Sequence, residues 1–456
     1  MDAYDFRAVG TGQIDSLRLQ QLLEETCRKS GIPGLSVSLF SHGRHVSAAV
    51  GVASASTGTR LTTDSMFQLG CITKLVTSLL AAQLAHAGLL NLEAPLAEYL
   101  VEFRKVTNAR EVQVQHLASH TSGYQGLNIA NPAAAYFYSW KKFTSFFRET
   151  PKLFSPGTVF NYEHTECVLL GEIIRRLTGT PVHRLMCQLV FEPLGIAVGR
   201  ITPNTSQRAI TASDHGFDTS SGRYQVLRSV PYCSFWASSL SDFTVSITGL
   251  MTLARALIGK SDSTLPRQAT KQCQEQVIRI PNTIGGSKRE HLPLSFGKGC
   301  AQYAGRLLGH NGSSRGQTCA IRFDPVNCVI AVVAINAWQP YVRDWLLSRL
   351  LHEHRPPAAS SVEQSEAWTL EELEGNYVGC VQGANIIVRR RNDYLECFLA
   401  NRSSNAQIHF TMQFDGAGRL LSVSELHHLS VGLFRDPTSG CPCMMLGMNA
   451  FKRELS

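Results

Sequence analysis

The chain has 456 residues, 44% of them hydrophobic and 17% charged, a balance typical of folded globular proteins that excludes wholesale disorder. This length exceeds one ordinary hydrophobic core, so two or three domains are expected. The net charge of +8 is scattered along the chain. Its densest basic cluster, Arg389–Arg391, lacks the interleaved aromatic residues of a nucleic-acid site, so no nucleic-acid partner is expected.

The N-terminal segment and the cysteines indicate where the protein works. The first residues, MDAYDFRAVGTGQIDS, lack the basic start and apolar run of a secretory signal. The sequence has no run of about 18 apolar residues, so no membrane span is predicted. The 13 cysteines form no CxxC pair, and Cys441 and Cys443 have no second ligand pair at zinc spacing. We therefore expect reduced thiols, a cytoplasmic location, and neither a metal nor a cofactor.

Apolar residues in the first half of the chain recur mainly at helical spacing. The expected elements are a helix over 14–30, two strands within 34–54 joined at His42-Gly43, a strongly apolar helix over 72–87, a helix near 112–120 and another over 166–177. Glycines follow the first and last of these helices, at Gly31 and Gly179, where a left-handed residue would end them.

The second half changes character after its last helical pattern. Asp242 is expected to cap a helix that reaches about residue 258, and residues 305–337 alternate like neighbouring antiparallel strands with a turn at Asp324-Pro325. Residues 356–367 are rich in Pro, Ala, Ser and Glu, which predicts a linker. Short alternating runs over 368–456 predict a small antiparallel β domain, so the expected division is 1–355, 356–367 and 368–456.

Three short motifs follow one another along the chain. They are Cys71-Ile-Thr-Lys74, Tyr162-Glu-His164 and His310-Asn311-Gly312. Residues three apart on a helix share a face, so the Cys71 thiol and the Lys74 amine would point the same way. Thiols are mostly protonated at neutral pH, since their pKa is about 8.5; a charged Lys74 would stabilise the thiolate, and a neutral one would accept the proton. Both charge states stay open, and the alternative for Cys71 is a buried structural cysteine.

The order of these motifs resembles the serine β-lactamase and penicillin-binding-protein superfamily. The segments MFQLGCITK, HLASHTSGY, FSPGTVFNY and GHNGSSRG also resemble its conserved stretches, over roughly residues 14–350. The similarity is greatest to class C β-lactamase-like esterases, D-aminopeptidases and fungal polyketide acyltransferases, and residues 368–456 resemble the lipocalin-like domain that some of them carry. The resemblance implies an α/β (α+β) fold: an antiparallel sheet flanked by helices, a helical subdomain and a small C-terminal antiparallel β domain.

The resemblance also implies a role for each motif residue. Cys71 would be the nucleophile, Lys74 its activating amine, and Tyr162 the proton shuttle between leaving group and second nucleophile. The backbone N–H groups of Cys71 and Ser313 would form the oxyanion hole. The residues expected to position the substrate are His164, His310, Asn311 and Gly312. The neighbouring His116 and His120 are expected to serve the structure of their turn.

Two positions depart from the pattern of the superfamily. Serine is usual where this chain has Cys71, and asparagine is frequent where it has His164. A cysteine forms a thioester, which amines and thiols attack readily, so acyl transfer and exchange with other thioesters are favoured. His164 leaves the binding of a β-lactam side chain in doubt and could add acid–base chemistry near neutral pH. Both changes argue against antibiotic hydrolysis.

The expected function is acyl transfer or hydrolysis of a small-metabolite ester, thioester or amide through a Cys71 acyl-enzyme, in cytosolic secondary-metabolite biosynthesis. The expected partner is a small-molecule acyl substrate, either free or attached to a carrier protein or CoA. Two alternatives stay open: a non-catalytic β-lactamase-like binding protein, and a covalent cyclase or peptidase acting on a peptide-like substrate. The sequence does not indicate an oligomeric state.

Overall fold

The computed structural model divides into two compact units that alternate along the chain. Unit 1 combines Met1–His86, Thr180–Cys273 and Gly305–Arg355, and unit 2 combines Ala87–Gly179, Gln274–Ala304 and Pro356–Ser456. The described residues are 14–106, 109–126, 139–150, 152–200, 210–227, 239, 243–259, 264–281, 293–352, 367–379, 384–401, 407–414, 420–423, 431–446 and 448–454. Residues 356–366 of the expected linker lie outside them, and the three-part division stays a prediction.

An antiparallel sheet with the order β2-β1-β13-β12-β11 forms the core of unit 1. Its strands are β1 (Gly34–Ser41), β2 (Arg44–Gly51), β11 (Leu308–Ser313), β12 (Thr318–Asp324) and β13 (Val329–Ile335). The expected turns at His42-Gly43 and after Asp324 connect them. Every residue of β12 and β13 is buried, although successive side chains point to opposite faces, so both faces of these strands are covered.

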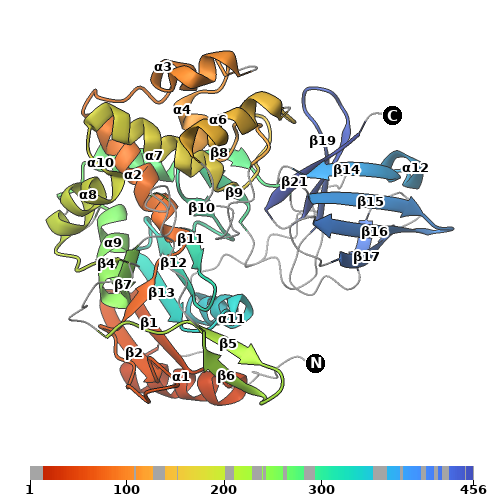
Figure 1. The fold of residues 1–456 in the computed structure, drawn as a ribbon. Helices are drawn as coiled ribbons and strands as arrows, with labels where there is room; N and C mark the ends of the chain where they lie inside the picture. The colour runs from red at the N-terminus through yellow and green to blue at the C-terminus, as the bar shows by residue number, and fades with distance from the viewer. Residues whose placement is uncertain are drawn as a thin grey trace. The chain divides into compact units, whose positions relative to one another are not determined.

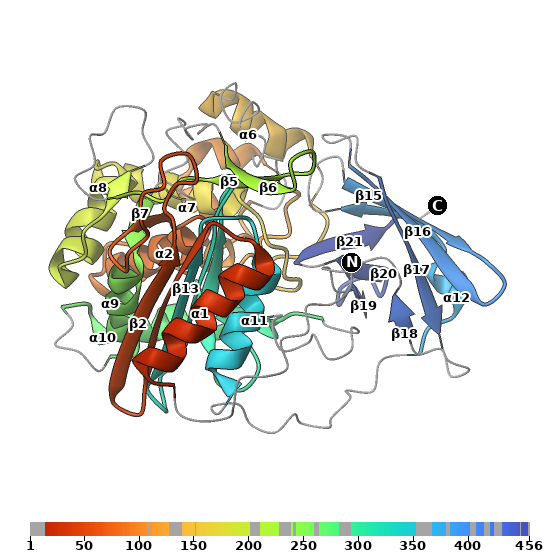
Figure 2. The same cartoon turned by 90° about the horizontal axis from the view of Figure 1, so that it is seen from below.

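Helices supply this cover. Contacts join α1, α9 and α11 to the sheet, and Figure 2 shows α1 and α11 in front of it. The helices of unit 1 are α1 (Ser16–Ser30), α2 (Ile72–His86), α8 (Val182–Met186), η2 (Cys187–Phe191), η3 (Glu192–Leu194), α9 (Ile247–Leu257), α10 (Arg267–Gln274) and α11 (Pro340–Leu350). Two smaller sheets pair β3 (Met66–Gln68) and β4 (Gly199–Arg200) with β7 (Phe243–Ser246), and β5 (His215–Asp218) with β6 (Arg223–Val226).

The start of α9 differs from the sequence expectation. Asp242 itself lies outside the described residues, but the helix begins at Ile247, and Ser246 Oγ accepts the Gly249 N–H at 3.1 Å as its cap. Residues 243–246 instead pair with Met66–Gln68 as a strand. The aromatic and β-branched run Phe-Thr-Val favours this extended conformation. The predicted cap was therefore wrong.

Unit 2 contains a helical part and a second large sheet (Figure 1). The helices are α3 (Leu96–Tyr99), η1 (Val101–Lys105), α4 (Val114–Ala118), α6 (Trp140–Glu149), α7 (Thr165–Thr178) and α12 (Leu370–Leu373), with short strands β8 (Gln276–Arg279), β9 (Ser295–Gly297) and β10 (Ala301–Gln302). As expected, α7 ends at Gly179, whose φ is 68°. Among the described residues of the chain, no helix is long and apolar enough to cross a membrane.

The C-terminal part of unit 2 is an antiparallel sheet with the order β18-β17-β16-β15-β14-β21-β20-β19. Its strands are β14 (Gly375–Gly379), β15 (Ala384–Arg390), β16 (Tyr394–Asn401), β17 (Gln407–Phe414), β18 (Leu420–Val423), β19 (Val431–Arg435), β20 (Pro442–Leu446) and β21 (Asn449–Arg453). Buried side chains such as Tyr377, Phe410 and Met444 form its core. The expected α/β (α+β) class with antiparallel sheets and a C-terminal β domain is thus confirmed.

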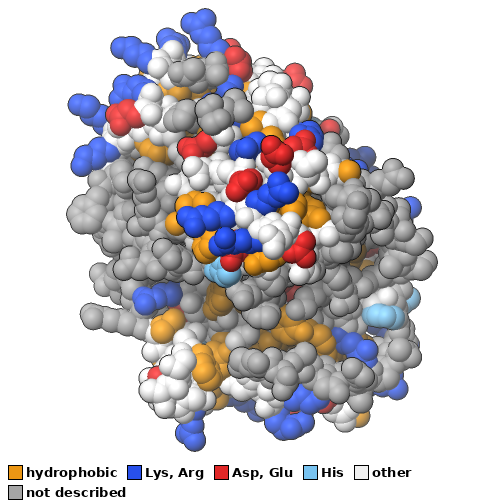
Figure 3. Space-filling model, turned by 90° about the vertical axis from the view of Figure 1, so that its right-hand side faces the viewer, with side chains coloured by type: hydrophobic (Ala, Val, Ile, Leu, Met, Phe, Trp, Pro, Cys, Tyr) orange, Lys and Arg blue, Asp and Glu red, His pale blue; other side chains and the backbone are white. Residues whose placement is uncertain are grey.

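The basic cluster at the β15–β16 turn is balanced by acidic neighbours. Arg391 pairs with Glu396 at 2.6 Å, and the Arg390 N–H donates to Glu374 at 3.2 Å. Figure 3 shows Lys and Arg side chains mixed with Asp and Glu on the described surface of one face. The described charges on this face are therefore of both signs and do not form a uniformly basic surface.

Helix α4 begins with a reciprocal cap that makes stability depend on pH. The His116 Nδ1 accepts the Gln113 N–H at 3.1 Å. Burial lowers the pKa of His116 from 6.5 to about 4. Because protonation is easier in the unfolded chain, this contribution to stability is complete above pH 6.5 and is lost as the pH falls toward 4.

We expect the free energy of unfolding of the wild type to fall more steeply from pH 6.5 to 4 than that of His116→Gln. The difference should be about 1–2 kcal/mol, a discounted figure because the ring is only partly buried. Urea unfolding followed by circular dichroism at several pH values measures it. The exposed His86 provides the control, since His86→Gln should keep the wild-type slope. Equal slopes for wild type and His116→Gln would contradict the assignment.

Candidate active site

Cys71 lies directly before the first residue of α2, as the sequence predicts. The turn around it is tight: the N–H groups of Ile72, Thr73 and Lys74 donate to the carbonyls of Leu69, Gly70 and Cys71 at 3.0–3.1 Å. The Cys71 side chain is half-buried. This position places the thiol at the positive end of the helix dipole.

Lys74 follows in the first turn of α2 and is only 2% exposed. Its position three residues after Cys71 places both side chains on one side of the helix start. Burial of a charged amine is costly, so a lysine at such a place usually has a specific role or partner. The structure thus places Lys74 in the first turn of the helix that follows Cys71.

Strand β11 carries the third motif and lies in backbone contact with the Cys71 turn. A β-carbon on Gly312 would collide with the carbonyl oxygen of Leu69. A β-carbon on Gly70, whose φ is 49°, would lie 2.6 Å from the Ser313 nitrogen. Glycines are thus required on both sides of this contact. This contact brings the segments that carry the Cys71 and Ser313 N–H groups side by side within unit 1.

Gly312 was expected to help position the substrate. In the structure its missing side chain makes room for the chain that leads into Cys71. Asn311, the neighbouring residue on the strand, points to the opposite face, because strand side chains alternate. There its Oδ1 accepts a hydrogen bond from the buried Arg322 guanidinium at 2.7 Å. His310 is 4% exposed, and its Nδ1 lies 2.6 Å from the Asn311 carbonyl oxygen.

A second thiol lies beside this group. Cys319 pairs with Gly312 across β11 and β12, and its Sγ lies 3.5 Å from the Leu69 carbonyl oxygen. Burial raises the pKa of Cys319 to about 12, and the nearby Cys71 adds to the rise. Cys319 therefore stays a neutral, buried thiol.

In unit 2, the backbone of Tyr162 is held by the turn between β20 and β21. The Tyr162 N–H donates to the Met448 carbonyl at 2.9 Å, and Asn449 Nδ2 donates to the Tyr162 carbonyl at 3.0 Å. The Ala450 N–H also donates to Asn161 Oδ1 at 3.1 Å. These contacts join residues about 290 positions apart in the sequence, so no local pattern could have predicted them.

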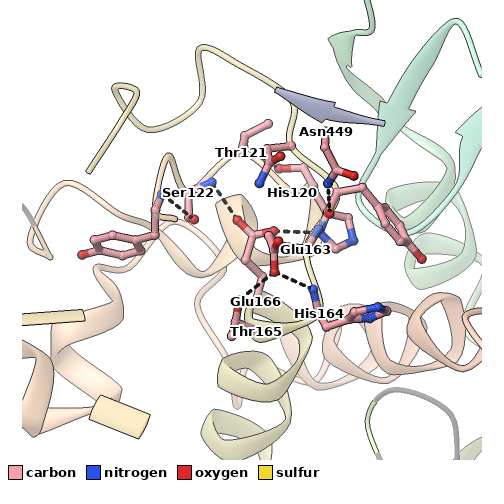
Figure 4. Close-up of polar contacts among 12 residues, drawn as sticks. His120, Thr121, Ser122, Glu163, His164, Thr165, Glu166 and Asn449 are labelled. Atoms are coloured by element: carbon pink, nitrogen blue, oxygen red, sulfur yellow. Dashed lines mark hydrogen bonds and ion pairs between the residues drawn. The ribbon is translucent and has the colours of Figure 1, made fainter. Parts of the chain in front are cut away.

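His120 and Glu166 form a buried pair in the same region, shown in Figure 4. His120 Nδ1 lies 2.7 Å from Glu166 Oε2, and the His120 ring lies 4.6 Å from the Tyr162 ring, centroid to centroid. His164 precedes α7, its N–H donates to Glu163 Oε2 at 3.1 Å, and its ring lies 6.2 Å from that of Tyr162. His120 was expected only to serve the structure of its turn, and no motif pointed to Glu166.

The site residues thus form two groups, each within its own unit. Cys71, Lys74 and the 310–313 strand belong to unit 1, and Tyr162 and His164 belong to unit 2. A Cys-x-x-Lys motif at a helix start, beside a glycine-containing strand of an antiparallel sheet, resembles the arrangement of penicillin-recognising enzymes, in which serine is usual at the position of Cys71.

The sequence matches the family model described as Beta-lactamase over residues 19–353, so the chain belongs to the beta-lactamase family. It is 27% identical to Penicillin-binding protein 4 of Amycolatopsis lactamdurans over 71% of this chain and 85% of the relative. It is 28% identical to Esterase EstB of Burkholderia gladioli over 39% of this chain and 50% of the esterase. The solved structure of SurE superposes with a TM-score of 0.74 at 22% identity, covering 96% of this chain and 98% of SurE.

The similar proteins support the fold and, in general terms, an acyl hydrolysis reaction. The structure also superposes on the octameric penicillin-binding protein homologue from Pyrococcus abyssi, with a TM-score of 0.63 at 20% identity over 96% of this chain. This confirms the β-lactamase-like architecture that the motifs predict. Family members named as esterase, carboxypeptidase and beta-lactamase are hydrolases, so the family supports enzymatic acyl hydrolysis in general.

Proposed function

We propose that this protein forms a covalent acyl-enzyme at Cys71 and transfers or hydrolyses the acyl group of a small-metabolite ester, thioester or amide. The observation that carries the proposal is the backbone contact of Gly70 with Ser313 beside the Cys71 turn. It supports an oxyanion hole formed by the Cys71 and Ser313 N–H groups, next to a nucleophile at a helix start and the buried Lys74.

In the proposed first step, the Cys71 thiolate attacks the substrate carbonyl, and the two N–H groups stabilise the resulting oxyanion. The carbonyl re-forms as the bond to the leaving group breaks, and Tyr162, in the role implied by the motif order, gives this group a proton. The product is a Cys71 thioester.

In the second step, water, an alcohol or an amine loses a proton to Tyr162 and attacks the thioester. The Cys71 thiolate leaves, and the acyl group has moved to the new acceptor. His164 and His310 are proposed to position the acyl donor. A thioester exchanges readily with other thioesters, which favours a donor attached to CoA or a carrier protein and a role in cytosolic secondary-metabolite biosynthesis.

Intact-protein mass spectrometry tests this function. The wild type is incubated with activated esters, acyl-CoA analogues and peptidyl thioesters, and a D-residue is included in the peptides because one solved relative is described as SurE with D-Leu. A mass gain equal to the acyl group, followed by its loss to water or to an added amine, supports the proposal. No adduct with any donor would contradict it.

Selective alkylation separates the enzyme from a non-catalytic binding protein. At neutral pH, a nucleophilic Cys71 should react with iodoacetamide before the other 12 of the chain's 13 cysteines. Peptide mapping after partial labelling identifies the modified thiol. The buried Cys319, whose pKa is raised, is the internal control and should stay unmodified in the folded protein. Equal labelling of Cys71 and the other half-buried thiols, such as Cys27 and Cys328, would favour the binding protein.

A further inference from the structure

The imidazole of His120 packs against the ring of Tyr162, with 4.6 Å between centroids and 44° between planes. The His120 backbone has a φ of 56°, which is unusual for a residue other than glycine. The residue is also 1% exposed. Unusual backbone conformations at buried positions persist only where the surroundings enforce them, and they cluster at functional sites.

Glu166 fixes the orientation of this imidazole. Its Oε2 lies 2.7 Å from His120 Nδ1, and its Oε1 accepts the Ser122 N–H at 3.1 Å (Figure 4). The Glu163 N–H also approaches Nδ1, but at 3.3 Å. The shorter contact has the length of a charge-assisted hydrogen bond, so the Nδ1 proton is donated to an ionised Glu166.

The charge of Glu166 favours a cationic His120, which in turn favours ionisation of the Tyr162 hydroxyl. A carboxylate 2.7 Å away stabilises the cationic form of an imidazole, and both side chains are buried, where charges interact strongly. A cation against a phenol ring attracts the phenolate more strongly than the phenol. We propose that His120 and Glu166 are a positioning pair that keeps the Tyr162 hydroxyl easy to ionise. This inference rests on the proposed function, in which Tyr162 carries the proton.

Among the described residues of unit 2, the other groups packed on Tyr162 do not place a positive charge as close to its ring as His120 does. The His164 ring is farther away, at 6.2 Å, and Phe296 of β9, at 6.3 Å, is apolar. Met448 and Asn449 contact the backbone of Tyr162 through neutral groups. The Glu163 carboxylate accepts the His164 N–H and the Thr165 hydroxyl.

The direct test is the ionisation midpoint of Tyr162. Protein labelled with [ζ-¹³C]tyrosine gives one NMR signal for each of the 12 tyrosines, and Tyr162→Phe identifies the signal of interest. We expect His120→Gln and Glu166→Gln each to raise the midpoint by one pH unit or more. In the acylation assay, where Tyr162 donates its proton, the alkaline limb of the pH–rate profile should move to higher pH. The weaker acid should cost about tenfold in rate at pH 7, and this loss should shrink at alkaline pH.

His116→Gln is the matched control, because it also removes a partly buried imidazole near this turn but leaves the Tyr162 contact intact. It should change stability without moving the midpoint. Unchanged midpoints in folded His120→Gln and Glu166→Gln, or a rate loss equal at every pH, would overturn the proposal. The titration of Tyr162 needs no turnover. A wild type that fails to acylate would therefore overturn the proposed function, while the titration would still decide the role of His120 and Glu166.

Discussion

Cys71→Ala is expected to lose covalent acylation completely and to reduce turnover by a factor of about 10³ or more. Removal of the nucleophile leaves only substrate binding and the two backbone donors, which cannot form the thioester. The measurement compares the mass gain and the turnover of wild type and variant with the donor that acylates the wild type best. The half-buried Cys71 makes few packing demands, so the variant should fold with wild-type stability.

Cys71→Ser is the informative companion, since it keeps the size of the side chain and returns the residue usual in the superfamily. We expect slower acylation, and an ester intermediate that amines and thiols attack less readily than the thioester. The ester adduct should therefore accumulate. Turnover of Cys71→Ala near the wild-type level would show that another group carries the chemistry.

Gly312→Ala is expected to reduce the acylation rate by about 10²–10³, comparable with the loss of one oxyanion-hole donor. The new methyl group would collide with the Leu69 carbonyl oxygen and approach Cys319 Sγ to 2.7 Å. Either the Cys71 turn or the end of β11 must move, and the distance between the Cys71 and Ser313 N–H groups changes with it. Overpacking should also cost about 1–3 kcal/mol of stability.

Gly58→Ala is the control for that prediction. Gly58 has a φ of 66° but open space around its missing side chain, so its replacement strains the backbone without pushing on the site. Thermal unfolding and the acylation rate are measured for both variants. If Gly312→Ala is folded and acylates at the rate of Gly58→Ala, the contact between β11 and the Cys71 turn has no catalytic importance.

Local signals in the sequence predicted much of the fold and the unit-1 group. Gly31 ends α1 in the left-handed conformation, as expected from its place after the helical pattern. The Cys-x-x-Lys spacing before an apolar run placed Cys71 at the start of α2. These features depend on neighbours within a few residues, which is why a single sequence reveals them.

The rest depends on contacts between distant segments. Glu166 binds His120 across 46 positions, and each residue alone has an ordinary explanation, a helix-start acid or a turn histidine. The Asp242 prediction failed for the same reason, because pairing with the distant β3 extends residues 243–246 as a strand. The motif residues could thus be found from the sequence, but their supporting partners could not.

The hydrogen bonds between Tyr162 and the β20–β21 turn have a consequence for how such proteins evolve. A C-terminal domain that merely accompanied the enzyme could be exchanged between relatives by recombination at the segment before it. Here Asn161 and Tyr162 share hydrogen bonds with residues 448–450, so replacing either segment alone would disturb these contacts. Chimeras that take the C-terminal sheet from another relative should work only when both segments come from the same parent.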